Sequence, residues 1–247
     1  MMLILPRISL QIQFGLLQNL PSILCCHVLN PQPGQRALDM CAAPGNKTTH
    51  LATLMENTGE IIALDKSQKK IDRIISLCEC LGISCVKAYV CDSTKCTRDD
   101  IEEEKRSTYP FFTPSSFDSV LLDAPCSGLG QRPQLLNNIT VKQLKSYPPL
   151  QKKLFRSATS LVKTGGNLVY STCTMTMAEN EDIVQWALKE FPELKLLPAE
   201  PILGNPGSSQ NGLNEEACQL VQRFGPPFGE TPETDTIGFF IAKFVKV

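Results

Sequence analysis

Short apolar runs alternate with amphipathic stretches along most of this chain, and this alternation constrains the fold more than any other feature. The segment after Ser67, for example, places Ile71, Ile74 and Cys78 on one face and ends at Gly82. Strands separated by helices in this way predict a mostly parallel α/β sheet that is covered by helices on both faces. The strands are predicted at residues 36–40, 60–64, 85–90, 119–123, 167–171 and 237–245.

The segments between the strands complete a single domain, which a chain of 247 residues is long enough to form. Helices are predicted at 46–55, at 67–82, over a stretch that includes Leu150 and Val162, and after Thr176 and Glu179, which have capping-box spacing. A charged stretch at 99–106 leads into a Pro/Ser-rich loop. Residues 198–235 are rich in Pro and Gly and predict a long, mobile surface excursion. We expect residues 1–30 to be the remnant of a longer N-terminal segment and residues 31–247 to be the functional domain.

Cysteine usage and charge narrow the cellular setting. The chain has 11 cysteines but neither a secretory signal nor an apolar run long enough to cross a membrane, so we expect it in the reducing cytoplasm. It has no pair of Cys-x-x-Cys units and only 2 histidines, so no metal site is predicted. Its 24 Lys and Arg residues against 25 Asp and Glu residues argue against strong nucleic-acid binding by this chain alone. A local basic groove or a second binding domain stays compatible with this balance.

Chemistry-bearing residues follow the predicted strands, at the edge where an open parallel sheet binds ligands. Asp65 and Asp92 follow the second and third strands. An acid after the second strand typically binds two ribose hydroxyls, although a helix cap is an equally good interpretation of Asp65, and Asp92 could be a solvated loop acid. The first strand is not followed by Gly-x-Gly-x-x-Gly, which favours an adenosine-bearing cofactor other than a dinucleotide. The remaining motifs are Asp39-Met-Cys-Ala-Ala-Pro-Gly-Asn-Lys-Thr48, Asp123-Ala-Pro-Cys-Ser-Gly128 and Ser171-Thr-Cys-Thr174.

These three motifs, in this order and at these strand ends, resemble those of the Sun-domain (RsmB/NOP-type) RNA cytosine-5 methyltransferases. The resemblance runs from Gln18-Asn-Leu-Pro-Ser22 to Gly238-Phe-Phe-Ile-Ala-Lys243. Within the family the chain resembles the tRNA-acting sixth Sun-domain member, which also carries a PUA domain that is not recognisable here. The family's second motif glycine is replaced by Asn46, but asparagine tolerates left-handed backbone geometry, so we expect the loop to form.

The resemblance implies a Rossmann-like class I methyltransferase fold with a seven-stranded, mostly parallel sheet and an antiparallel C-terminal strand. It also implies S-adenosylmethionine as the cofactor. The ribose hydroxyls would be bound by Asp65, the adenine side by Asp92, and the methyl group would be bordered by Asp123. The methionine and sugar would lie against Cys41, Ala42, Ala43, Pro44, Gly45, Asn46 and Lys47.

The reaction that the resemblance implies needs two cysteines in different roles. Cys173 would add to carbon 6 of cytosine and activate carbon 5, and Cys126 would assist proton removal and product release. Asp123 would hydrogen-bond the cytosine edge, and the charge of Lys47 would favour a thiolate. Taken alone, cysteines in apolar segments are more often inert core residues, but strands 119–123 and 167–171 should be neighbours, which lets both thiols face one cleft.

The implied substrate is RNA, specifically tRNA, with a target cytosine that is single-stranded or frayed, because a stacked base cannot be enclosed. No obligate protein partner and no membrane are inferred. Two alternatives stay open. One is a catalytically silent scaffold that binds RNA or cofactor but lacks RNA-binding parts, and the other is a methyltransferase for small molecules or proteins, which would not require two cysteines at strand ends.

Overall fold

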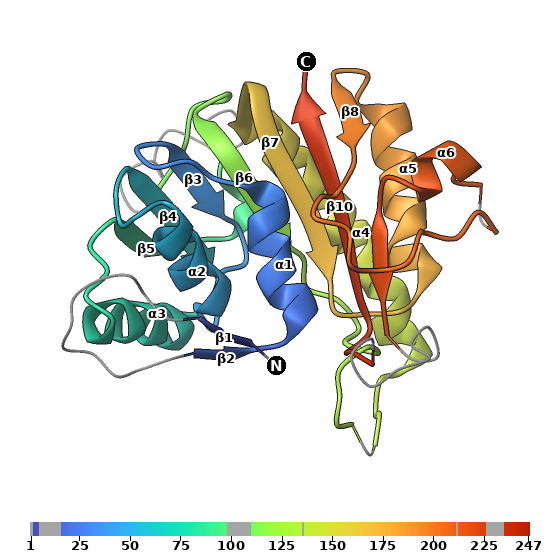
Figure 1. Cartoon of the computed structure of the whole chain (residues 1–247), viewed down its shortest axis with the longest axis horizontal. Helices are drawn as coiled ribbons and strands as arrows, with labels where there is room; N and C mark the ends of the chain where they lie inside the picture. Colours follow the sequence, from blue (N-terminus) through green and yellow to red (C-terminus); the bar gives the residue numbers. More distant parts are fainter. Residues whose placement is uncertain (1, 5–15, 98–109, 135, 211, 226–234) are drawn as a thin grey trace.

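The computed structural model describes residues 2–4, 16–97, 110–134, 136–210, 212–225 and 235–247. It is built on one sheet with the strand order β5-β4-β3-β6-β7-β10-β8, and β9 (Gln222–Phe224) pairs with β10 outside this path (Figure 1). β10 runs antiparallel to β7 and β8, and the other pairs along the path are parallel, as predicted. A separate antiparallel pair joins β1 (Met2–Ile4) to β2 (Leu16–Gln18). The strands of the path are β3 (Arg36–Asp39), β4 (Glu60–Asp65), β5 (Val86–Val90), β6 (Phe117–Asp123), β7 (Val162–Thr172), β8 (Leu194–Leu197) and β10 (Phe239–Lys246).

Helices cover both faces of the sheet, which confirms the layered arrangement predicted from the sequence. Side chains alternate across each strand, so Ala37 packs into the hydrophobic cluster under α1 to α3, whereas Leu38 packs into the cluster under α4 and α5. Within the described residues, no helix is both long and apolar enough to cross a membrane. The helices are α1 (Leu20–Leu29), α2 (Asn46–Leu54), α3 (Gln68–Cys80), α4 (Val141–Leu161), α5 (Glu181–Glu190) and α6 (Glu215–Cys218).

α1 lies within the segment that we expected to be a remnant, yet it packs tightly onto the domain. It contacts α2, β6, β7 and β10, and Cys25, Val28 and Leu29 are fully buried. Its start has proline in the first turn, a position where the missing N–H costs no hydrogen bond. α1 therefore contributes to the same hydrophobic cluster as α2 and α3.

α4 is longer at its start and shorter at its end than the sequence pattern suggested. It begins at Val141, because Thr140 and Gln143 form a reciprocal capping box that starts the helix ahead of its two internal prolines. The assignment of Val162 to this helix was wrong. Val162 pairs with Phe117 and opens β7, with a register shift before the next paired residues.

The Pro/Gly-rich region lies largely on the surface over its described residues 198–210, as expected of a surface excursion, whereas several residues of 212–225 are buried against the domain. Gln222 is fully buried and holds the region together. Its amide nitrogen donates to the carbonyl oxygens of Ala199 and Pro201, and its oxygen accepts from the N–H groups of Leu203 and Gly204. Residues 226–234 of the predicted excursion, and the charged stretch 99–106, lie outside the described residues.

The capping box predicted at Thr176 and Glu179 takes a different form. Thr176 precedes a short 3₁₀ helix, Met177–Glu179, and α5 begins later with Asn180 at its N-cap. The Thr176 hydroxyl donates to the Glu179 carboxylate at 2.8 Å, and the Glu179 N–H donates to the Thr176 carbonyl at 3.3 Å. Glu179 is fully buried, because its carboxylate is used to hold other parts of the chain.

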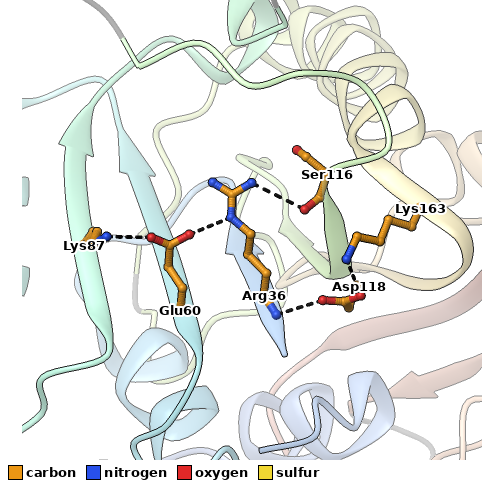
Figure 2. A network of polar contacts seen from close by, with 6 residues as sticks. All are labelled: Arg36, Glu60, Lys87, Ser116, Asp118 and Lys163. Carbon is orange, nitrogen blue, oxygen red and sulfur yellow. Dashed lines mark hydrogen bonds and ion pairs between the residues drawn. The ribbon is translucent and has the colours of Figure 1, made fainter. Parts of the chain in front are cut away.

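Charged side chains join the amino ends of the parallel strands, at the edge away from the predicted site (Figure 2). Glu60 accepts from Arg36 at 2.6 Å and from Lys87 at 2.7 Å, and Asp118 accepts from Lys163 at 2.6 Å and from the backbone N–H of Arg36 at 2.9 Å. The hydrogen bonds from Lys87 and Arg36 lower the pKa of Glu60. Positive and negative groups neutralise one another here, so this edge serves to align β3 to β7.

Candidate active site

The residues expected at the site gather at the carboxyl edge of the sheet, as the strand-end argument predicted. Cys41 directly follows β3, Asp65 ends β4, Asp123 ends β6 and Cys173 follows β7. A cavity of about 350 Å³ lies among them and is lined by Lys47, Asp123, Cys126, Gln131, Cys173 and Phe239, together with the loop after β3. A second cavity of about 250 Å³ adjoins the first, since Cys41, Asp65, Lys70 and Pro125 line both.

The loop after β3 turns sharply at Gly45, where the backbone has φ +107°. A side chain would be strained at this angle, and a Cβ atom would lie 3.3 Å from both Ile74 and Leu77. Asn46, by contrast, is the first residue of α2 and is absent from the non-glycine residues with positive φ in the described chain. The loop therefore forms as expected, but the argument from left-handed tolerance of Asn46 was wrong because Gly45 carries that geometry.

Lys47 and Asp123 form an ion pair at the floor of the larger cavity. Lys47 Nζ donates to Asp123 Oδ2 at 2.7 Å, and Ser171 Oγ donates to Asp123 Oδ1 at 2.8 Å. Burial alone would lower the pKa of Lys47, but the charge of Asp123 outweighs it and the pKa is raised. Lys47 Nζ also lies 5.3 Å from the centre of the Phe239 ring. The ammonium group is therefore held charged and fixed beside the two cysteines.

Cys126 and Cys173 face each other across the same cavity, with 3.3 Å between their sulfur atoms. The hydrogen bond from Cys126 lowers the pKa of Cys173 to about 7, against the effect of burial, and Gln131 and Lys47 act in the same direction. The pKa of Cys126 is raised, first by its hydrogen bond to Cys173 and then by burial. The contacts around the pair therefore favour ionisation of Cys173 over Cys126, with Cys126 as the thiol that donates to it.

Asp65 and Asp92 both contribute to helix starts. Asp65 Oδ1 accepts from the N–H of Ser67 at 3.0 Å, while Oδ2 lies 3.5 Å from Lys70 Nζ. Ser67 occupies the predicted N-cap position of α3 but makes no side-chain capping bond. Asp92 accepts from the N–H of Thr94 and pairs with Lys66 at 3.2 Å. Asp65 lines both cavities, whereas for Asp92 it is the neighbouring Ser93 that lines the smaller one.

Sequence reasoning did not select Asp39, although Asp39 opens the first motif. Its Oδ2 accepts from Thr48 Oγ1 at 2.7 Å, and its Oδ1 is buried without a partner in the described part of the chain. Burial raises the pKa of Asp39 to about 6. Asp39 lines a further cavity of about 100 Å³ together with Ala42, Lys47 and Asp123. An uncompensated buried carboxylate oxygen in a cavity wall is suited to a cationic ligand group.

Sequence reasoning also did not select Gln131 or Glu179 as residues of the site. Gln131 Nε2 donates to Cys173 Sγ at 3.1 Å, and Glu179 Oε2 accepts from the backbone N–H of Ser127 at 2.9 Å. The only sequence signal for Gln131 is its position just after the Asp123 motif. Glu179 was interpreted only as a capping-box residue, so its contact with the Cys126 loop was not predicted.

Among the described residues, no group of three or more His, Cys, Asp or Glu side chains could hold a metal ion.

Comparisons with known proteins agree with the motifs and the fold. A family model described as 16S rRNA methyltransferase RsmB/F matches residues 26–245. The tRNA (cytosine(72)-C(5))-methyltransferase NSUN6 of Homo sapiens is 49% identical over 249 residues, which cover 93% of this chain and 53% of that protein. The tRNA (cytosine(72)-C(5))-methyltransferase of Pyrococcus horikoshii is 37% identical over 230 residues, which cover 93% and 52%. The chain therefore spans about half the length of these curated relatives.

A solved structure gives the same result. The crystal structure of NSun6 from Pyrococcus horikoshii with SFG superposes with a TM-score of 0.78 at 36% sequence identity, and covers 94% of this chain and 53% of that one. This likeness confirms the predicted Rossmann-like class I methyltransferase fold. Because the family model matches nearly the whole chain, the resemblance drawn from the motifs is confirmed as well: this chain belongs to the RsmB/F family of Sun-domain methyltransferases.

Proposed function

We propose that this chain is the catalytic domain of an S-adenosylmethionine-dependent RNA cytosine-5 methyltransferase that acts on tRNA. The observation that carries the proposal is the pair formed by Cys126 and Cys173, 3.3 Å apart in a cavity that also contains the Lys47–Asp123 ion pair. Membership of the RsmB/F family supports the reaction type, and the two tRNA-acting relatives support tRNA over the rRNA of the family description.

The residues present fit S-adenosylmethionine. The methionine part of this cofactor carries an ammonium group, and the unpartnered Oδ1 of Asp39 is a buried acceptor for such a group. Asp65, between the two adjoining cavities, would take the ribose hydroxyls, and the loop Cys41 to Lys47 would lie against the methionine and sugar. Asp92 would lie toward the adenine side. When bound, the cofactor supplies an electrophilic methyl group on a sulfonium.

Cys173 is suited to the nucleophilic role because the hydrogen bonds from Cys126 and Gln131 lower its pKa. Its sulfur would bond to carbon 6 of cytosine, and the electron pair of the 5,6 double bond would move toward carbon 5 and the ring nitrogen and oxygen. Lys47 is fixed where its charge can stabilise the electron-rich ring. Asp123 accepts from Lys47 and Ser171, keeps lone pairs free and would accept from the exocyclic amino group of the base.

Cys126 is suited to the release step. Its pKa is raised chiefly by the hydrogen bond to Cys173, so the main cause disappears once Cys173 has become a thioether. Cys126 would then lose its proton to solvent, against the burial that still raises its pKa, and accept the proton from carbon 5. The 5,6 double bond forms again as the bond between carbon 6 and sulfur breaks, and Cys173 leaves as a thiolate.

The substrate must present an extruded cytosine. Cys173 is half-buried in the cavity of about 350 Å³, so the target nucleotide has to leave any stack to reach it, as it does in a single-stranded or frayed site. The formal net charge of −1 favours help from RNA-binding parts outside this chain. The 11 cysteines suit a reducing compartment, the cytoplasm, and we propose no obligate protein partner.

The test combines label transfer with covalent trapping. The protein is incubated with tritiated S-adenosylmethionine and, separately, a tRNA pool and ribosomal RNA, and labelled 5-methylcytosine is measured. Label in tRNA supports the proposal. Label in ribosomal RNA alone contradicts the choice of substrate. Cofactor binding by calorimetry without label in any RNA favours the silent scaffold.

Variants separate the two cysteines. Cys126→Ala should accumulate an RNA–protein adduct on denaturing gels, because release is impaired, whereas Cys173→Ala should form none. Cys80→Ala is the matched control, since Cys80 is exposed on α3 and should change neither result. Methylation retained in Cys173→Ala would refute the assigned roles and favour a methyltransferase that does not use a covalent intermediate.

A further inference from the structure

The sulfur atoms of Cys126 and Cys173 lie 3.3 Å apart in one cavity. The groups around each sulfur therefore determine which of the two carries the negative charge. Burial opposes ionisation of both cysteines. The backbone N–H of Gly128 favours charge on Cys126, whereas the side-chain amide of Gln131 favours charge on Cys173. Gln131 Nε2 lies 3.1 Å from Cys173 Sγ, which is ordinary for a hydrogen bond to sulfur.

The backbone holds Gln131 in place although its side chain is exposed. Its N–H donates to the Gly128 carbonyl at 3.0 Å, and the preceding Gly130 donates to the Cys173 carbonyl at 3.0 Å. Gly130 in turn accepts from the N–H of Gly238 at 2.8 Å. A Cβ atom on Gly130 would lie 2.1 Å from the Gly238 carbonyl oxygen, so this approach leaves no room for a side chain. The loop is thus clamped between Cys173 and the start of β10.

We propose that Gln131 is a positioning residue that directs the negative charge to Cys173 rather than to Cys126. The amide N–H donates to the Cys173 sulfur and stabilises it as an anion, and Cys126 then serves as the second donor. An amide neither gains nor loses a proton near neutral pH, so Gln131 acts through Cys173 and takes no proton itself. The inference rests on the proposed function only for its meaning in catalysis, since the charge on the two thiols exists without RNA or cofactor.

The test measures which cysteine reacts first with iodoacetamide between pH 5.5 and about 8.5, a range that brackets ordinary and lowered thiol pKa values. Carbamidomethylated Cys126 and Cys173 are quantified by peptide mass spectrometry, without RNA or cofactor. In the wild type, Cys173 should react first and its rate should rise through neutral pH. In Gln131→Leu, the ratio of modified Cys173 to modified Cys126 should fall by about tenfold, because one hydrogen bond to an anion is lost.

Two further variants keep the result interpretable. Gln131→Glu has the same size but places a carboxylate beside the sulfur, so the ratio should fall at least as far as in Gln131→Leu, even if the leucine variant folds poorly. Gln134→Leu makes the same chemical change at another exposed position of the loop and should leave the ratio unchanged. A change that reflected loosened structure alone would raise the reactivity of both cysteines together and leave the pH profile of Cys173 where it was.

The outcomes separate this inference from the proposed function. Unchanged ratios in both Gln131 variants would overturn the inference, whatever the methylation assay gives. A reversed ratio would support it even if no RNA were methylated. With tRNA and cofactor, Gln131→Leu should also shift the pH profile of adduct formation upward, which a purely structural role would not do.

Discussion

The carboxylate of Glu179 accepts a hydrogen bond from the backbone N–H of Ser127, the residue next to Cys126, at 2.9 Å. The same oxygen accepts from Gln151 on α4 at 3.0 Å, and the other oxygen accepts from Thr176 at 2.8 Å. One fully buried carboxylate therefore joins the Cys126 loop, α4 and the segment after Cys173.

Glu179→Gln should lower the free energy of unfolding by about 1–3 kcal/mol, because the amide nitrogen cannot accept and a buried donor loses its partner. Urea denaturation measures the loss. The control is Glu190→Gln, which removes an exposed ion pair with Arg156 and should cost about 0–1 kcal/mol. Equal losses in the two variants would contradict a special role for the buried carboxylate.

Cofactor binding should weaken at acid pH because of Asp39. Burial raises the pKa of Asp39 to about 6, so the carboxyl group is charged at pH 7 and becomes neutral as the pH falls through 6. A neutral carboxyl group no longer attracts an ammonium group, so the Kd for S-adenosylmethionine should rise by about tenfold per pH unit below 6. Calorimetry between pH 5 and about 8 follows this, a range chosen to bracket the shifted carboxyl pKa.

Asp39→Asn provides the control for this pH dependence. It keeps an acceptor for Thr48 but removes the titrating charge, so its Kd should be weak and nearly independent of pH. A wild-type Kd that stays constant from pH 7 to about 5 would show that Asp39 does not face the cationic part of the cofactor.

The two residues at the start of α2 should respond differently to substitution. Gly45→Ala should lower the free energy of unfolding by about 1–3 kcal/mol, because alanine is strained at φ +107°. Asn46→Gly should cost less than about 1 kcal/mol, because Asn46 is absent from the positive-φ residues of the described chain. Urea denaturation of both variants tests this, and a larger loss for Asn46→Gly would contradict it.

Peroxide should inactivate the protein reversibly by joining Cys126 to Cys173. The sulfur atoms are 3.3 Å apart, so two thiols can lose two protons and two electrons to one peroxide molecule, which leaves as two water molecules. Mass spectrometry should find the linked peptides, and dithiothreitol should restore adduct formation. Loss of activity without this link, in a protein whose other cysteines are unmodified, would contradict the prediction.

The parts of the fold that the sequence could predict are those with long local patterns. The apolar runs at β3, β4, β6 and β10 alternate with helical segments, and these elements appear where expected. β8 was not located, because its four residues carry too short a pattern and depend on pairing with β10. The sequence pattern did not predict that α4 begins at Val141, because prolines such as Pro148 and Pro149 usually occur at a helix start and not inside a helix. The capping bonds at Thr140 show where the helix begins.

The residues of the candidate site also divide into those that the sequence could locate and those that it could not. Lys47, Asp123, Cys126 and Cys173 could be located together because the carboxyl ends of parallel strands meet at one edge. Gln131 and Glu179 could not, because each acts through a hydrogen bond to a residue far along the chain, 42 positions for Gln131 to Cys173 and 52 for Glu179 to Ser127. Such partners leave no periodic signal in the sequence.

The contact between Gly130 and Gly238 has a consequence for biosynthesis. β10 follows every other strand of the sheet along the chain, yet it lies between β7 and β8 and its approach fixes the loop beside Cys173. The Gly238 contact to Gly130 exists only when β10 lies in the sheet, so during synthesis the loop beside Cys173 can be held in this way only after residues 238–246 have emerged and paired with β7.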